Sequence, residues 1–219
     1  MHKIVQNLLT IKNEIKLNLK HESSDKLPKI IAVSKTFNME RILPLIDFGH
    51  SDFGENKVQE ANEKWSDIKS KNPNIKLHML GKLQTNKVKL ALRIFDYIHS
   101  VDSVKLANKI SEEQKKNNKK LKLFIQINIG DEKQKSGVDK DNLINFYNYC
   151  KKLNLDVIGL MCIPPVGNDP VKYFKIMCDL RNLINLEELS MGMSSDYIKA
   201  TKNSSTYLRI GTGIFGKRI

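Results

Sequence analysis

Lys35 stands directly after a short, mostly apolar segment, residues 30–34, which is typical of a buried β-strand. A lysine at the end of such a strand is expected to be partly desolvated, so that its neutral amine can condense with an aldehyde to form an imine. The chain has 32 lysines, and a lysine in this place can also extend its charged end into solvent. Position alone therefore leaves both interpretations of Lys35 open.

Two segments near the C-terminus are rich in glycine and hydroxyl side chains, LSMGMSSD (189–196) and RIGTGIFG (209–216). Glycine lets backbone N–H groups approach an anion, and serine or threonine adds hydroxyl donors. Such segments can also be plain turns between strands and helices, but the presence of two of them favours a phosphate-binding site. The first segment contains Ser190, Gly192 and Ser194, and the second contains Gly211, Thr212, Gly213 and Gly216.

These residues need elements that position them, and the rest of the chain predicts such elements. An amphipathic helix is predicted over residues 2–20, and eight β-rich segments then alternate with helical ones. The strands are predicted at 30–34, 50–53, 76–79, 97–100, 121–128, 156–161, 187–190 and 207–210. The helices between and after them are predicted at 39–48, 56–70, 84–94, 103–119, 139–152, 168–185 and 194–203.

This alternation predicts one α/β domain over residues 1–219, a (β/α)8 TIM barrel with an extra N-terminal helix. An open doubly wound sheet is the alternative, but the count of eight strands favours the barrel, and no G-x-G-x-x-G sequence follows the first strand. Pro44 is expected to mark the start of its helix or a kink in it. The predicted helix N-caps are Asn38, Asp102 or Ser103, and Asp139.

A closed parallel barrel would bring the candidate residues together. Functional side chains lie at the carboxyl ends of the strands, and phosphate commonly binds after strands 7 and 8. Because the first and eighth strands are neighbours in a closed barrel, Lys35 would face the glycine-rich segments, with Arg209 between them. A ligand with an aldehyde, a ring nitrogen and a phosphate fits this arrangement. Pyridoxal 5′-phosphate (PLP) carries all three, and its ring nitrogen takes an Asp or Arg partner.

Eight segments of the chain, in order, closely resemble the pyridoxal phosphate homeostasis protein family. They are IAVSKT (31–36), FGENKVQE (53–60), HMLGKLQTNKVK (78–89), IHSVDS (98–103), IQINIGDEKQKSGV (125–138), IGLMCIPP (158–165), LSMGMSSD (189–196) and STYLRIGTGIFGKR (205–218). The resemblance covers the chain from about Ile31 to the C-terminus and implies a fold-type III barrel like the N-terminal domain of alanine racemase. Lys82, Ile129 and Cys162 depart from the residues usual in the family, and none of them removes an implied ligand.

The resemblance also implies the roles of the site residues. Lys35 would hold PLP covalently as an internal aldimine, Asn56 would lie beside the ring, and Arg209 would face the pyridine nitrogen. One of two serines, with Gly211 and Thr212, would bind the phosphate, and a histidine and a methionine from the third and sixth strands would line the pocket. The implied cofactor-binding residues are Lys35, Asn56, His78, Met161, Ser190, Ser194, Arg209, Gly211 and Thr212. No metal ligand and no catalytic residue is implied.

Arg209 bears on the expected activity. A guanidinium stays protonated, so it should leave the pyridine nitrogen unprotonated and make the ring a poor electron sink. The sequence ends at Ile219, directly after the last glycine-rich segment, and we expect no second domain that would supply an opposing base. The expected function is therefore PLP homeostasis, as a carrier or reservoir whose partners are PLP and PLP-dependent apo-enzymes, without robust catalytic activity.

Two alternatives remain open. The first is a weak PLP-dependent amino-acid racemase or lyase. The second is a phosphate-sugar barrel enzyme without PLP, which would need an acid/base carboxylate at a strand end, either Glu55 or Asp131. Glu55 is expected instead to be a surface residue at the start of a helix. A second PLP site would have to use another lysine, with Lys82, Lys87 and Lys135 as the candidates.

Composition argues against several other classes. The formal charge is +13, but only five residues are arginine, the side chain favoured for phosphate and base recognition, and no nucleic-acid-binding motif is present. The three cysteines, Cys150, Cys162 and Cys178, are too widely spaced for a C-x-x-C site and are expected to be reduced thiols. No apolar stretch is long enough to cross a bilayer, and the N-terminus has no targeting pattern. We therefore expect a cytoplasmic protein that binds neither nucleic acid nor membrane, and we also expect a monomer.

Overall fold

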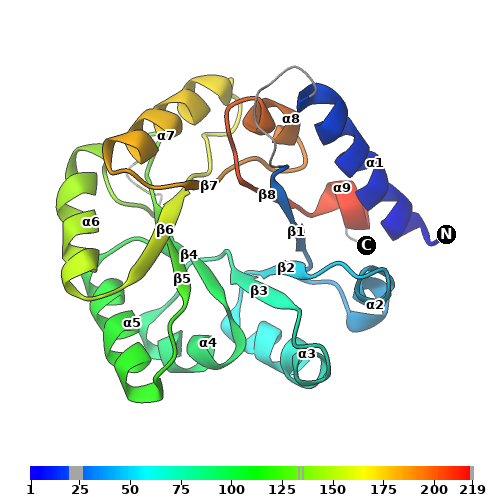
Figure 1. The fold of residues 1–219 in the computed structure, drawn as a ribbon, viewed down its shortest axis with the longest axis horizontal. Helices are drawn as coiled ribbons and strands as arrows, with labels where there is room; N and C mark the ends of the chain where they lie inside the picture. The colour runs from blue at the N-terminus through cyan, green and yellow to red at the C-terminus, as the bar shows by residue number, and fades with distance from the viewer. Residues whose placement is uncertain (20–26, 133, 135, 218–219) are drawn as a thin grey trace.

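The computed structural model describes residues 1–19, 27–132, 134 and 136–217. The described residues form a closed barrel of eight parallel strands that follow one another around the barrel in chain order (Figure 1). The strands are β1 (Lys29–Val33), β2 (Asp52–Glu55), β3 (Lys76–Met79), β4 (Tyr97–Val101), β5 (Lys122–Gln126), β6 (Asp156–Met161), β7 (Glu188–Ser190) and β8 (Tyr207–Ile210). The predicted (β/α)8 barrel, with its extra N-terminal helix, is confirmed.

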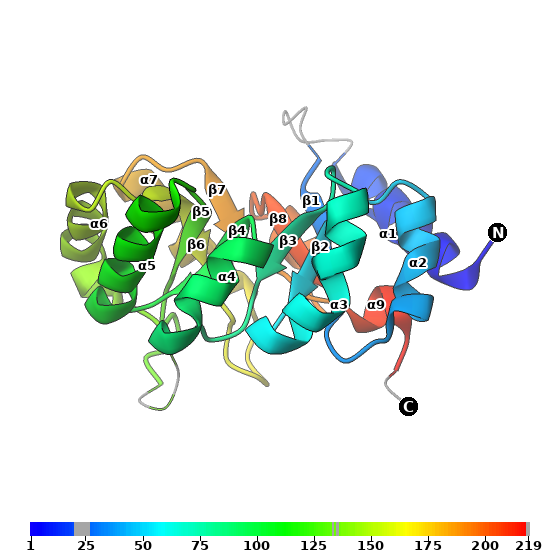
Figure 2. The same cartoon turned by 90° about the horizontal axis from the view of Figure 1, so that it is seen from below.

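Helices surround the barrel, as the second view also shows (Figure 2). They are α1 (Lys3–Leu19), α2 (Met39–Asp47), α3 (Val58–Lys71), α4 (Val88–Ile94), α5 (Val104–Asn117), α6 (Leu143–Lys152), α7 (Val171–Leu183), α8 (Tyr197–Thr201) and α9 (Thr212–Phe215). Two 3-10 turns, η1 (Thr85–Lys87) and η2 (Lys140–Asn142), precede α4 and α6. The helix predicted over 194–203 is shorter than expected, and the short α9 was not predicted.

The helix N-caps follow the sequence in two places. The side chain of Asn38 accepts a hydrogen bond from the backbone N–H of Arg41, and Ser103 caps α5 in the same way. Asp139 precedes the turn η2 without a side-chain cap. Pro44 lies inside α2, which begins at Met39, so the prediction that proline could mark the start of this helix is wrong.

The N-terminal helix α1 holds the end of the chain against the barrel. Its buried apolar stripe is Ile4, Val5, Leu8, Ile11, Ile15 and Leu19. It packs against α9, α8 and α2, and both views place α1, α2 and α9 together on one side of the barrel. The side-chain amide of Asn7 donates a 2.8 Å hydrogen bond to the carbonyl of Ile214 in α9. Lys20, the last residue of the predicted helix, lies outside the described residues, as does Lys135.

The barrel has two buried regions of different character. The larger apolar core lies between the strands and the surrounding helices. A separate cluster fills the barrel interior and comprises Ile31, Tyr97, Phe124, Met161 and Tyr207. Buried polar side chains, among them His78, His99 and Ser190, share that interior, so the centre of the barrel is not purely apolar.

The cysteines are free thiols, and Cys150 and Cys162 are buried. Burial raises the pKa of each of these two thiols to about 12. In the part of the chain that the structure describes, no helix has both the length and the apolar character to span a membrane.

Candidate functional site

A cavity of about 480 Å³ opens at the carboxyl ends of strands β1, β2, β3, β6, β7 and β8. Its size falls within the range typical of small-molecule and cofactor sites. Six of the nine residues predicted for the site line it, namely Lys35, Asn56, Ser194, Arg209, Gly211 and Thr212. The other lining residues are Val33, Leu80, Ile163, Met193 and Ser195. We call this space the carboxyl-end cavity.

The other three predicted residues do not line the carboxyl-end cavity. His78, Met161 and Ser190 lie in the barrel interior, with exposed fractions of 0, 1 and 0%. The hydroxyl of Ser190 contacts His99 and Arg209 at hydrogen-bond distance and has no exposed surface from which to reach a ligand. Of the two serines considered for the phosphate, the structure places only Ser194 at the cavity.

Arg209 reaches the cavity from the end of β8 and is almost fully buried. Its Nη1 donates to the carbonyl oxygen of Ser190 at 2.5 Å and to the hydroxyl at 2.7 Å, and its Nη2 donates to the carbonyl of Cys162 at 2.8 Å. Burial lowers the pKa of the Arg209 guanidinium. A guanidinium has five N–H donors, so these three acceptors fix its plane and leave donors for a ligand in the cavity.

Lys35 is half-buried in the turn that follows β1. The next residue, Thr36, has a φ of 68°, which is uncommon for a β-branched side chain and marks a turn that its surroundings must hold. The backbone N–H of Thr36 donates to Oε1 of Glu60 at 2.7 Å. Lys64 donates from Nζ to the carbonyl of Ser34 at 3.0 Å and to the same Glu60 oxygen at 3.1 Å. Contacts from α3 therefore fasten the residues on both sides of Lys35.

Glu55 belongs to the same network, through its contact with Lys64. The prediction for this residue is wrong. It is the last residue of β2 and fully buried, not a surface residue that opens a helix, because the strand extends two residues further than predicted. Its Oε1 accepts from the hydroxyl of Ser34 at 2.7 Å, from Nζ of Lys64 at 3.0 Å and from Nε1 of Trp65 at 2.9 Å. Asp131, the other carboxylate considered as an acid or base, is exposed and pairs with Lys140.

Sequence reasoning did not identify Glu60 and Lys64 as part of the site. Their i,i+4 spacing on α3 indicates a helix ion pair. Only the packing of α3 against the turn after β1 gives the pair its other partners, the carbonyl of Ser34 for Lys64 and the N–H of Thr36 for Glu60. Burial acts to raise the pKa of Glu60, but the hydrogen bonds from Thr36 and Lys64 outweigh it, and the pKa is lowered. Glu60 is therefore held as a carboxylate that fastens the Lys35 turn.

The opposite side of the cavity consists of main-chain and hydroxyl groups. Gly211 and Thr212 lie at the start of α9, and the hydroxyl of Ser194 accepts a 3.1 Å hydrogen bond from the N–H of Gly213. A Cβ on Gly213 would lie 3.1 Å from Cγ2 of Ile210, so glycine allows this segment to pack tightly on β8. Hydroxyl and N–H donors of this kind suit a phosphate group.

Asn56 follows β2 directly and lies beside Gly81. A Cβ on Gly81 would lie 2.3 Å from the carbonyl oxygen of Asn56, so only glycine lets the segment after β3 approach this residue so closely. The backbone of Asn56 is thus fixed at the wall of the cavity.

The charges around the cavity have one sign. Lys35 and Arg209 are cationic side chains, and no carboxylate is found among the described residues that line it. Over the same described part of the chain, no group of three or more His, Cys, Asp or Glu residues could hold a metal ion. The arrangement therefore suits an anionic organic ligand that carries a group reactive toward an amine.

Comparisons with known proteins agree with this geometry. The family model "Alanine racemase, N-terminal domain" matches residues 7–218. The pyridoxal phosphate homeostasis protein of Haemophilus influenzae is 36% identical, over 98% of this chain and 96% of that protein. The human protein of the same name is 37% identical, over 87% of this chain and 77% of its own length.

Solved structures show the same relationship. PipY of Synechococcus elongatus, in a structure with PLP bound, is 32% identical, with a TM-score of 0.84 over 97% of this chain and 100% of that one. Alanine racemase of Clostridium difficile is 16% identical, with a TM-score of 0.75, and 57% of that chain is covered, so it shares the fold alone. From the identity and coverage of these relatives, the chain belongs to the pyridoxal phosphate homeostasis protein family.

Proposed function

We propose that this protein binds PLP as a Schiff base on Lys35 and serves PLP homeostasis as a carrier or reservoir of the cofactor. The proposal rests on one observation: Lys35, Arg209 and the phosphate-binding candidates Ser194, Gly211 and Thr212 all line the carboxyl-end cavity of about 480 Å³. Relatives named for PLP homeostasis, and a relative solved with PLP bound, support it.

The lining residues fit each part of the cofactor. The amine of Lys35 suits the aldehyde, and the donors at Ser194, Gly211 and Thr212 suit the phosphate. Arg209, whose plane is fixed by Ser190 and Cys162, suits the ring nitrogen. When bound, PLP supplies an electrophilic aldehyde and a conjugated ring, and the residues of this chain anchor and orient it.

The cavity offers little for turnover. Among its described lining residues, Lys35 and Arg209 are the only side chains that titrate, and no histidine, tyrosine, cysteine or carboxylate stands opposite the lysine. Racemisation needs a base on each face of the substrate carbon, and Arg209 leaves the ring a weak electron sink. These features favour storage and delivery of PLP over catalysis, and no contact in the cavity favours a racemase or lyase.

The remaining parts of the proposal concern the cellular setting. A cytoplasmic monomer that loads PLP and yields it to PLP-dependent apo-enzymes would make use of a reversible Schiff base. A transfer assay tests this: the holo-protein is mixed with an apo-enzyme, and the recovery of that enzyme's activity is compared with recovery from the same amount of free PLP. Sedimentation of the holo-protein at several concentrations tests the monomeric state.

The proposed site is tested by loading the protein with PLP and recording its spectrum. A Schiff base is expected to absorb at about 420 nm. The band should be lost in Lys35→Ala but kept in Lys82→Ala, which removes an exposed lysine outside the cavity. A band that survives in Lys35→Ala, or is lost equally in both variants, would refute the proposed site.

A further inference from the structure

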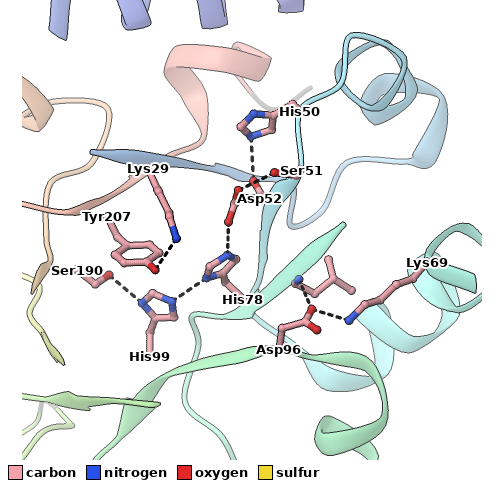
Figure 3. Close-up of polar contacts among 11 residues, drawn as sticks. Lys29, His50, Ser51, Asp52, Lys69, His78, Asp96, His99, Ser190 and Tyr207 are labelled. Carbon is pink, nitrogen blue, oxygen red and sulfur yellow. Dashed lines mark hydrogen bonds and ion pairs between the residues drawn. The ribbon is translucent and has the colours of Figure 1, made fainter. Parts of the chain in front are cut away.

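A chain of polar side chains runs through the barrel interior beneath Arg209. The hydroxyl of Ser190 lies 2.7 Å from Nη1 of Arg209 and 2.8 Å from Nδ1 of His99. Nε2 of His99 lies 3.0 Å from Nδ1 of His78, whose Nε2 lies 3.0 Å from Oδ1 of Asp52. Figure 3 shows this chain from Ser190 to Asp52. We call these five residues the barrel relay.

Asp52 and Arg209 fix the direction of every hydrogen bond in the barrel relay when both imidazoles are neutral. An ionised carboxylate can only accept, so His78 donates from Nε2 to Asp52, and its Nδ1 then accepts from Nε2 of His99. Nδ1 of His99 in turn accepts from the hydroxyl of Ser190, which itself accepts from Arg209, because arginine can only donate. With neutral rings, this single arrangement of protons satisfies all four contacts, and both imidazoles are protonated at Nε2.

The surroundings of the two rings support that arrangement. Both histidines are fully buried, and burial lowers the pKa of His78 and lowers the pKa of His99 further still. Burial acts to raise the pKa of Asp52, but the hydrogen bond from His78 and other contacts outweigh it, and the pKa is lowered. Neutral rings and an ionised carboxylate at neutral pH follow from these directions.

Aromatic stacking holds the rings in place. His78 stacks on Tyr97 with ring centroids 4.2 Å apart and 13° between the planes, and His99 stacks on Phe124 at 4.2 Å and 15°. Because the rings cannot turn freely, they present their nitrogens to fixed partners.

The two ends of the relay lie at opposite ends of the barrel. Arg209 is in the carboxyl-end cavity, whereas Asp52 is the first residue of β2 and lines a second cavity of about 420 Å³, together with Lys29 and His50. In the described part of the chain, no carboxylate forms an ion pair with the buried guanidinium. Among the described residues, the relay connects this cation to an anion through direct hydrogen bonds.

From this geometry we infer that Asp52, His78 and His99 are positioning residues for the cofactor contact of Arg209, acting through Ser190. The inference rests on the proposed function and deepens it. The negative charge of Asp52 polarises the aligned hydrogen bonds, so that the Ser190 hydroxyl becomes a stronger acceptor and holds the guanidinium in the plane that faces the ligand. Loss of the Asp52 charge at the amino end of the barrel should therefore weaken PLP binding in the carboxyl-end cavity.

The test compares two carboxylates of similar exposure. Asp52 and Asp96 have exposed side-chain fractions of 18 and 24%, and each pairs with one basic side chain, but Asp96 pairs with Lys69 outside the relay (Figure 3). Asp52→Asn keeps an acceptor for His78 and removes the charge. We expect it to weaken PLP binding about fivefold, the order of one ordinary hydrogen bond, and Asp96→Asn to change it less than about twofold. Equal PLP affinities in the two variants would overturn the inference.

Nitrogen NMR of the protein without PLP gives a second and independent measurement. In the parent protein, His78 and His99 should both appear neutral and protonated at Nε2. Asp52→Asn should also move the Nδ1 resonance of His99, one ring beyond the substituted side chain, and Asp96→Asn should leave it in place. A cationic ring, a proton on Nδ1, or an unmoved His99 resonance would overturn the relay. If the parent protein does not bind PLP on Lys35, the proposed function fails, and these resonances still decide the relay.

Discussion

Removal of Lys64 should destabilise the protein more strongly than removal of any exposed lysine. Its Nζ is the cationic partner of Glu55, a carboxylate with no exposed surface, and it also contacts Glu60 and the carbonyl of Ser34. Lys64→Met keeps most of the packing volume of the side chain and deletes the charge. The buried Glu55 then retains only the neutral donors of Ser34 and Trp65.

The size of the effect follows from burial. Breaking a buried ion pair by removing one partner typically costs about 3–5 kcal/mol, because it leaves a buried charge without compensation. The two neutral donors that remain on Glu55 place the expected loss near the lower limit, about 3 kcal/mol. Glu55→Gln removes the stranded charge, so the double variant Lys64→Met/Glu55→Gln should recover about 2 kcal/mol of the loss.

The assay is urea unfolding followed by circular dichroism, with Trp65 fluorescence as a second probe, since Trp65 is the only tryptophan of the chain and is fully buried. Lys116→Met is the matched control, because Lys116 and its partner Glu112 have exposed side-chain fractions of 60 and 47%. The control should lose less than about 1 kcal/mol.

Two results would refute this reasoning. One is a Lys64→Met variant no less stable than Lys116→Met. The other is a double variant Lys64→Met/Glu55→Gln whose free energy of unfolding is no higher than that of Lys64→Met alone. If the reasoning holds, Lys64→Met should also weaken PLP binding, because the turn that presents Lys35 loses its attachment at Ser34.

Further predictions concern the cavity, the pH dependence and the thiols. Arg209→Lys should weaken PLP binding by about 10- to 100-fold in a titration, because one ammonium cannot replace a planar guanidinium that contacts Ser190 and Cys162 at once; unchanged affinity would exclude the proposed ring contact. Burial lowers the pKa of His50 from 6.5 to about 4. Between these two pH values the unfolded state therefore binds more protons than the folded state, and the free energy of unfolding should fall as the pH drops from 6.5 to about 4. His50→Gln should make that decline shallower, and a slope equal to the parent's would contradict this. Cys178, the half-buried thiol, should react with a thiol reagent before the other two cysteines in the folded protein; simultaneous labelling of all three would contradict the burial described.

Much of the fold could be predicted because the barrel repeats one local pattern. The eight strands were each predicted from short β-rich runs, and β3, β6 and β8 match the predicted bounds. Errors arose where tertiary contacts set the local structure. The predicted helix over 194–203 begins only at Tyr197, because Asp196 accepts a hydrogen bond from the N–H of Met193 and shapes the preceding residues into a loop. Glu55 was misplaced because β2 lies two residues later than its apolar pattern indicates.

The candidate site also has a part that could be predicted from the sequence and a part that could not. Lys35, Asn56, Arg209 and Gly211 follow or end strands, so barrel topology alone brings them to one end, and the resemblance to a known family assigns them roles. The barrel relay could not be predicted, because it joins side chains from β2, β3, β4, β7 and β8 whose contacts depend on strand register. The pairing of Gly54 with His78, and of His78 with Tyr97, is set by the closure of the barrel and leaves no local signal in the sequence.

The central claim is that Lys35 carries the cofactor, and chemical mapping of the linkage tests it most directly. The protein is loaded with PLP and reduced with borohydride, which converts a Schiff base into a stable pyridoxyl-lysine, and its peptides are then mapped. The label is expected on Lys35 alone, with loss of the labelled peptide in Lys35→Ala. A label on another lysine with Lys35 unmodified, or label spread evenly over many lysines, would contradict the account.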